Sequence, residues 1–160
     1  MKKLLLLLLF IPLMSIGQIT YKDVMSIKSV DTFKKVAIEN GYEFNGLDED
    51  DFIMYGFDIS KDSINGNKST KWLYYDPEDD IFVLQFSRKG FFGLNDEGEY
   101  DLIIAEIKEK CSFYKIIEND GTDFVSYSCP ESSYEGKIGF VVMDDTGVIM
   151  HFPNELFLDE

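Results

Sequence analysis

The chain has 160 residues, of which 45% are hydrophobic, so it can build one packed domain and is not a disordered protein. Asp and Glu number 30 against 15 Lys and Arg, which gives a net charge of −15. Nucleic acids and anionic lipids both attract basic surfaces, so this charge balance argues against both kinds of partner. Aromatic residues make up 15% of the chain, and this surplus needs an explanation.

The first 17 residues have the pattern of a cleaved secretory signal. Met1–Lys3 is a short positive segment, Leu4–Met14 is an apolar run, and Ser15–Gly17 places small residues before Gln18. The alternative is an N-terminal membrane anchor, but this apolar run is too short to span a bilayer of about 30 Å. We therefore expect a signal peptide at 1–17 and a mature chain that begins at Gln18. A lipoprotein signal would place a cysteine at this position, so lipidation is not expected.

The end of this segment, Ser15-Ile16-Gly17-Gln18, resembles the signals of exported proteins from Bacteroidota-type Gram-negative bacteria. The resemblance covers the signal alone; it implies export and no particular activity. Cleavage removes two lysines, leaving 13 basic and 30 acidic residues and a net charge of −17. We expect one domain, residues 18–160, in the periplasm, with release from the cell as the alternative.

Two helices are predicted. Ser29 or Asp31 can cap the first, which Gly41 ends, and the second follows Gly98 and runs to Cys111. Their apolar positions recur at helical spacing: Val30, Phe33, Val36 and Ala37 in the first helix, and Tyr100, Ile103, Ile104 and Ile107 in the second.

Strand patterns follow each helix, separated by turn-forming sequences such as Asp76–Asp80, Asn119–Thr122 and Asp144–Gly147. The predicted strands are 42–44, 53–59, 72–75 and 81–87 after the first helix, and 114–117, 124–129, 138–143 and 148–152 after the second.

The two halves of the chain resemble each other at an offset of 70 to 72 residues. Asp51-Phe52-Ile53-Met54-Tyr55 matches Asp123-Phe124-Val125-Ser126-Tyr127 at three of five positions. This favours two pseudo-repeats, about 29–88 and 99–153, each of one helix plus four antiparallel strands. A chance likeness is the alternative, because aromatic residues and Asp are common in this chain.

The predicted fold class is α+β, with one antiparallel sheet and both helices on one face. The strand face that carries Tyr55 and Tyr127 should meet the helices. This element order resembles the beta-lactamase inhibitor protein fold, a saddle of two such repeats. The resemblance is one of topology without a shared motif, so it implies function only by analogy.

The two cysteines, Cys111 and Cys129, are predicted to form a disulfide. In a hairpin that turns at Asp120-Gly121, pairing of Glu118 with Asp123 puts Ser112 opposite Cys129, so Cys111 is one residue away. Two buried free thiols are the alternative.

No catalytic, metal-binding or cofactor-binding set is recognised in the sequence. His151 is the only histidine and alternates onto the face opposite Met150 and Phe152, where we expect a solvated surface. The acidic runs at 48–51, 76–80 and 144–145 read as solvated turns; calcium binding is the alternative, although none matches a known calcium loop.

The aromatic surplus predicts a binding surface. Phe52 and Met54 alternate away from Tyr55, and Trp72 and Tyr74 point to one face of their strand. Two helices cover only one face of a sheet, so either these side chains lie on an open face or the sheet folds over itself. Trp and Tyr dominate the energetics of protein interfaces, which makes these four residues the candidate binding set. Filling of the core is the alternative.

Three functions remain compatible with these observations. The first is an exported, non-enzymatic protein-binding module (an inhibitor, immunity-like or assembly factor) whose partner is another exported or envelope protein. The second is a structural or stress-related envelope protein without a discrete ligand. The third is a small hydrolase that uses carboxylates.

The connector Gly90–Leu94 is expected to plug the sheet, with a binding loop as the alternative.

Overall fold

A computed structural model of the chain describes residues 18–62, 66–87 and 98–154. The signal segment 1–17 and the connector Gly90–Leu94 lie outside the described residues. The three described helices are α1 (Tyr21–Ser26), α2 (Val30–Glu39) and α3 (Glu99–Lys110). The strands are β1 (Glu43–Leu47), β2 (Ile53–Phe57), β3 (Ser60–Asp62), β4 (Gly66–Lys68), β5 (Lys71–Asp76), β6 (Ile81–Ser87), β7 (Ser112–Asn119), β8 (Thr122–Ser128), β9 (Gly136–Met143) and β10 (Thr146–Pro153).

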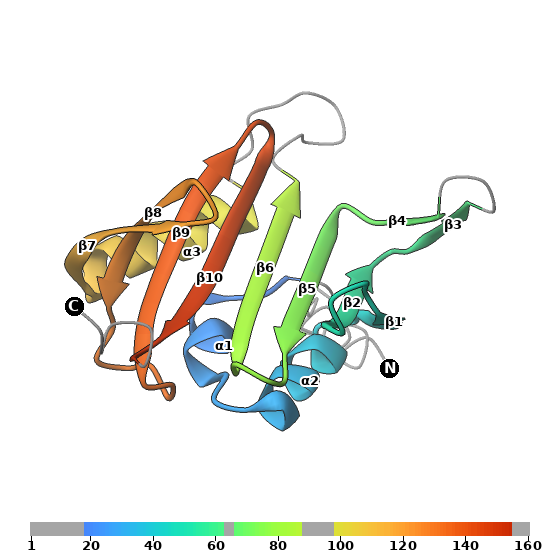
Figure 1. Ribbon diagram of the computed structural model, residues 1–160, viewed down its shortest axis with the longest axis horizontal. Coiled ribbons are helices and arrows are strands. Elements are labelled where there is room, and N and C mark those ends of the chain that lie inside the picture. The colour runs from blue at the N-terminus through green and yellow to red at the C-terminus, as the bar shows by residue number, and fades with distance from the viewer. Residues whose placement is uncertain (1–17, 63–65, 88–97, 155–160) are drawn as a thin grey trace, which may run out of the picture.

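Eight of these strands form one antiparallel sheet in the order β1-β2-β5-β6-β10-β9-β8-β7. Strands β6 and β10 join its two halves over five residue pairs, from Thr146↔Ser87 to Met150↔Val83. The short strands β3 and β4 pair separately. The predicted α+β class with an antiparallel sheet is therefore confirmed (Figure 1). No helix in the described part of the chain is long and apolar enough to cross a membrane.

The prediction of two copies of one unit, each with one helix and four strands, is not shown by the structure. Among the described residues, the first half contains two helices and six strands, whereas the second contains one helix and four strands. Helix α1 was not predicted, although its capping box between Thr20 and Asp23 is a recognisable signal. The additional hairpin β3–β4 arises because the predicted strand 53–59 stops at Phe57, and Asp58 adopts a positive φ of 52°.

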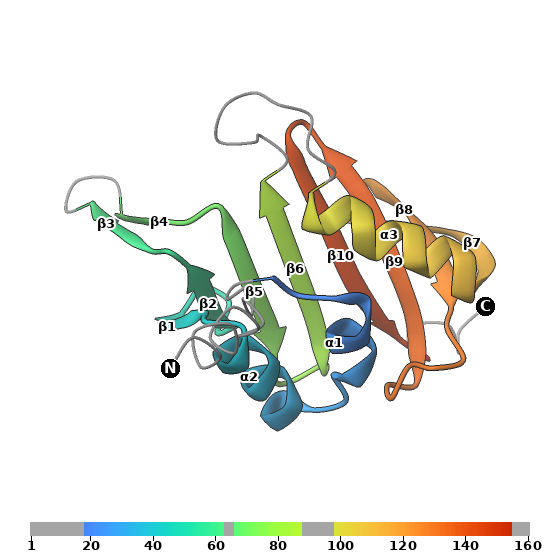
Figure 2. The same cartoon turned by 180° about the vertical axis from the view of Figure 1, so that it is seen from behind.

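All three helices lie on the same side of the sheet, behind it in Figure 1 and in front of it in Figure 2. Their apolar residues form the main core with the strand residues that point toward them. Phe33 of α2 contacts Tyr55 and Tyr75, with ring centroids 6.1 and 5.1 Å apart. Tyr127 packs against the same core, so the strand face predicted to meet the helices does so.

Cys111 and Cys129 lie at disulfide distance, with Cα atoms 4.4 Å apart. The hairpin β7–β8 pairs Glu118 with Asp123 as predicted, but Ser112 faces Ser128 and not Cys129. A bulge between Phe113 and Ile116 causes this shift of one residue.

Candidate functional site

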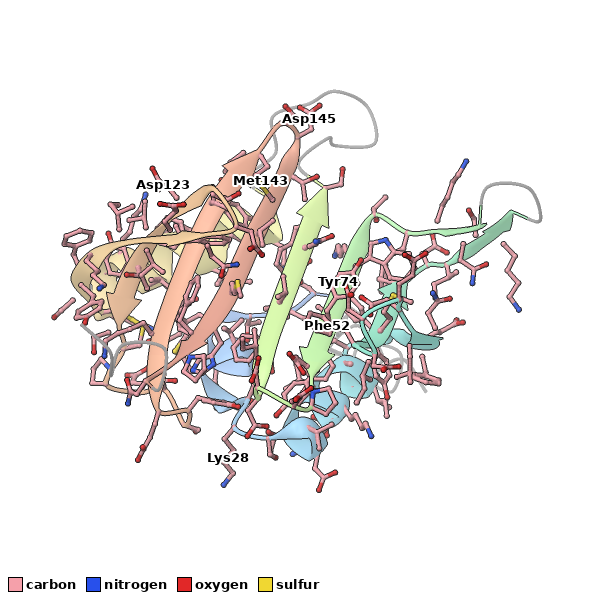
Figure 3. The ribbon with its side chains drawn as sticks, in the orientation of Figure 1. Lys28, Phe52, Tyr74, Asp123, Met143 and Asp145 are labelled. Carbon is pink, nitrogen blue, oxygen red and sulfur yellow. A yellow bond between two sulfur atoms is a disulfide. The ribbon has the colours of Figure 1, made fainter. Side chains whose placement is uncertain are left out.

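The side of the sheet that faces away from the helices carries the four aromatic and apolar residues predicted from the sequence. Phe52 directly precedes β2, and Met54 lies in β2 opposite Tyr74 of β5. Trp72 of β5 pairs with Gly56 of β2. Figure 3 shows Phe52 and Tyr74 over the β2–β5 part of the sheet, on the side turned to the viewer. All four side chains are half-buried.

The packing of Trp72 depends on a glycine in the neighbouring strand. A Cβ atom at Gly56 would come within 2.7 Å of Cζ3 of Trp72, so the indole lies directly over this backbone. The ring centroids of Trp72 and Tyr74 are 6.4 Å apart at an angle of 37°. The indole is therefore positioned by packing while part of it remains accessible to solvent.

This surface continues across the centre of the sheet. Met54, Tyr74, Val83 and Met150 occupy neighbouring positions on β2, β5, β6 and β10. Val83 and Met150 are half-buried and pack against a second apolar cluster. That cluster consists of Ile117, Phe124, Val148 and Phe152. We call the half-buried residues Phe52, Met54, Trp72, Tyr74, Val83 and Met150 the open face.

The sheet folds over itself at its other end. Strand β8 pairs with β9 only over Val125–Tyr127, and beyond these residues the hairpin β7–β8 crosses β9 on the side away from the helices (Figures 1 and 2). Phe124 and Phe152 are buried there, with ring centroids 5.3 Å apart. Both outcomes considered from the sequence therefore occur, at opposite ends of one sheet.

An acidic turn positions Phe52 at the edge of the open face. The Asp48 carboxylate accepts hydrogen bonds from the backbone N–H groups of Asp50 and Phe52, at 3.0 and 2.9 Å. Burial and the negative charge of Asp48 raise the pKa of Tyr74 above its ordinary value. The Tyr74 hydroxyl therefore stays protonated at neutral pH and can donate a hydrogen bond.

His151 lies in the core, so its expected place on a solvated face is wrong. It does point away from Met150 and Phe152, but onto the face that the helices cover, where it is fully buried. Its ring stacks on Phe82 at 5.3 Å and lies 3.8 Å from the ring of Tyr134, centroid to centroid. Period-two alternation predicted the side of the strand correctly but could not predict which side is covered.

The environment of His151 favours the neutral imidazole. Among the described residues neither ring nitrogen makes a hydrogen bond of ordinary geometry, although the backbone of Glu135 lies close to the ring. Burial lowers the pKa of His151 to about 4, although the nearby Asp80 carboxylate opposes this shift. At neutral pH the ring carries no charge.

The acidic runs form turns. Asp76 accepts hydrogen bonds from the backbone N–H groups of Glu78 and Asp79 at 2.8 and 3.4 Å. Asp144 has a φ of 52° in the β9–β10 turn. Within residues 18–62, 66–87 and 98–154, no group of three His, Cys, Asp or Glu side chains could hold a metal ion.

A second apolar surface, which the sequence did not predict, lies at the β1 edge on the helix side. A pocket of about 340 Å³ is lined by Phe44, Leu47, Ile53 and Tyr55 and by Lys34 of α2. Phe44 and Leu47 are 61% and 55% exposed. A bulge between Phe44 and Gly46 brings Leu47 to the same side as Phe44, and simple alternation along the sequence does not predict this.

No protein-family model, no curated protein and no solved structure matches this chain.

Proposed function

We propose that this protein is an exported, non-enzymatic binding module that contacts another protein through the open face. The observation that carries this proposal is the apolar row Met54–Tyr74–Val83–Met150, which no described helix covers. Trp72 and Tyr74 are of the residue types that supply most interface energy, and they are pre-positioned by packing. A surface that is already ordered loses little conformational entropy when a partner binds.

Export follows from the predicted signal at 1–17 and places the mature chain in the periplasm. The cysteine pair at disulfide distance fits an oxidising compartment, since disulfides are rare in the cytosol. The partner is then another exported or envelope protein.

The open face favours this function over a structural envelope protein without a ligand. A protein without a binding partner would be expected to cover this side of its sheet with polar side chains. Here Trp72, Tyr74, Met54 and Met150 remain half-buried with no described helix above them (Figure 1).

A carboxylate hydrolase has less support. Burial raises the pKa of Glu99, which is the kind of shift that a catalytic acid needs. However, Glu99 forms an ion pair with Lys71 and accepts the backbone N–H of Ile19. These contacts give the carboxylate a structural role on the helix side of the sheet.

Affinity capture from an envelope fraction tests the proposal, with tagged mature protein as bait. We expect Trp72→Ala to reduce the captured partner by about tenfold, because a central Trp can contribute more than 1.4 kcal/mol to binding. Phe113→Ala is the matched control, since it removes an exposed aromatic side chain from the opposite edge strand β7. Equal capture by the wild-type protein and Trp72→Ala would contradict the proposal.

A further inference from the structure

Two acidic turns lie at the same end of the sheet, beside the open face. Ile53 pairs with Tyr75 and Asp76 pairs with Ile81, so the turn before β2 and the turn between β5 and β6 emerge together. The first turn contains Asp48, Glu49, Asp50 and Asp51, and the second contains Glu78, Asp79 and Asp80. The negative charge of Asp48 acts directly on Tyr74 of the open face.

The second turn forms one wall of a polar pocket of about 240 Å³. This wall consists of Glu78, Asp79 and Asp80. The rest of the pocket is lined by Tyr134 and Glu135 and by the end of β10. Pro153, which also lines the pocket, directly follows Phe152 on β10. Pro153 lies three residues beyond Met150, or about 10 Å along β10, and alternates to the side opposite Met150. Tyr134 contacts His151 and Phe82 on that side, so the pocket lies at the end of the sheet, toward the helix side.

Among the described residues that line this pocket there is no Lys or Arg side chain. Three ion pairs of the described residues, Lys35–Glu39, Lys71–Glu99 and Lys110–Glu106, lie elsewhere in the fold. His151, which lies behind Tyr134, is buried and makes no hydrogen bond of ordinary geometry among the described residues. The described carboxylates also lack the grouping of a metal site.

We propose that the partner of the open face is a basic amphipathic segment of a protein. Its apolar side chains cover the open face, and one Lys or Arg side chain reaches around the end of the sheet into the pocket beside Tyr134. The carboxylates of Glu78, Asp79 and Glu135 neutralise that charge, and the tyrosine ring offers it a cation–π contact. This inference rests on the proposed function, because the same open face receives the apolar side chains.

Charge complementarity selects this partner. The mature chain carries 30 acidic and 13 basic residues, so an acidic partner surface would be repelled. A purely basic segment without apolar residues would leave the open face uncovered, and a purely apolar one would leave the pocket carboxylates without a counter-charge.

Trp72 is the only tryptophan of the chain, so its emission reports docking on the open face. The probes are three synthetic peptides of about 14 residues, or about four helical turns, made of Leu and Lys, of Leu and Glu, or of Ser and Lys. The protein is the full exported chain in its oxidised form.

We expect the Leu/Lys peptide alone to shift the emission of Trp72 saturably. Its affinity should fall about tenfold between about 30 and about 300 mM salt, because screening weakens exposed charge pairs. In the double variant Asp79→Asn/Glu135→Gln, the affinity for the Leu/Lys peptide should fall about fivefold, and this affinity should depend less on salt. Glu109→Gln/Glu118→Gln removes the same charge from exposed positions on α3 and β7 and should change the affinity less than about twofold.

Equal affinity for the Leu/Glu peptide, or an equal loss in both double variants, would overturn the inference. Far-ultraviolet circular dichroism of both double variants shows that they are folded before affinity is compared. Failure of the proposed function gives a different result from failure of this inference. In that case the Trp72→Ala variant would capture the same amount of envelope partner as the wild-type protein does. If capture depends on Trp72 but neither on salt nor on Asp79 and Glu135, only the inference of a basic partner fails.

Discussion

The indole of Trp72 lies over the backbone of Gly56 on the neighbouring strand, so close that a Cβ atom there would be 2.7 Å from Cζ3. Residue 56 is therefore a glycine for a packing reason, and the position of the Trp72 indole on the open face depends on it. This relationship links the local packing of β2 and β5 to the shape of the open face.

We expect Gly56→Ala to displace the indole and to lower both stability and partner binding. The new methyl group would also meet Cγ1 of Ile59 at 2.8 Å, and overpacking of this kind typically costs about 1–3 kcal/mol. Urea unfolding and the emission spectrum of Trp72 measure the two effects. In Gly56→Ala/Trp72→Ala the combined loss should be smaller than the sum of the single losses, because the clash with the indole is gone. Additive losses would argue that the two residues are independent.

Trp72→Ala should destabilise the protein much less than truncation of a core aromatic. Trp72 is half-buried, whereas Phe82 is fully buried. We expect a loss of about 1 kcal/mol for Trp72→Ala and of about 3–5 kcal/mol for Phe82→Ala. Thermal melting of both variants provides the comparison. Equal losses would mean that the indole belongs to the core.

Acidification should destabilise the fold partly through His151. The unfolded histidine has a pKa near 6.5 and the folded one a pKa of about 4, so between these values the unfolded state binds more protons. Stability is therefore full above pH 6.5 and declines as the pH falls toward 4, by as much as about 3 kcal/mol.

His151→Leu keeps a side chain of similar size and removes this titration. Its stability should change less than that of the wild type between pH 7 and pH 4, as measured by urea unfolding at a series of pH values. Carboxylates contribute to both proteins and cancel in the comparison. If stability falls with pH in parallel for the two proteins, the pKa of His151 is the same in the folded and the unfolded state, and the prediction is wrong.

The cysteine pair should stabilise the exported protein. A bridge between Cys111 and Cys129 spans 18 residues, and closing such a loop is worth about 3 kcal/mol on the chain-entropy estimate. Cys111→Ser/Cys129→Ser should lose about this amount, and dithiothreitol should destabilise the wild type but not the double variant. Alkylation that detects two free thiols in the untreated exported protein would contradict the prediction.

The mature protein should begin at Gln18. Mass spectrometry of protein recovered from the periplasm is expected to show this terminus, either as glutamine or as pyroglutamate after loss of ammonia. The Ile19 side chain is 1% exposed, and its N–H donates to Glu99, so removal of one or two further residues should reduce stability. Recovery of the uncleaved chain from membranes would overturn the predicted location.

Sequence periodicity by itself determined most of the elements and the sides of the strands. Alternation placed Phe52, Met54, Trp72 and Tyr74 together, and the turn at Asp120-Gly121 brought the cysteines close. These predictions succeed because side chains alternate along a regular strand, and because a two-residue hairpin fixes the pairing next to its turn. The bulge between Phe113 and Ile116 shifts the pairing by one residue but leaves the cysteines close.

Only the tertiary structure decided which of these surfaces is covered. His151 and Trp72 both looked like residues of an accessible strand face, yet Phe82 and the segment Tyr134–Gly136 bury the first, whereas the second stays half-exposed. The acidic pocket needs the turn after β5 to meet the start of β9, segments that are more than 50 residues apart in the chain. Such long-range packing follows from how whole elements bury their apolar faces together, which no local pattern of residues encodes.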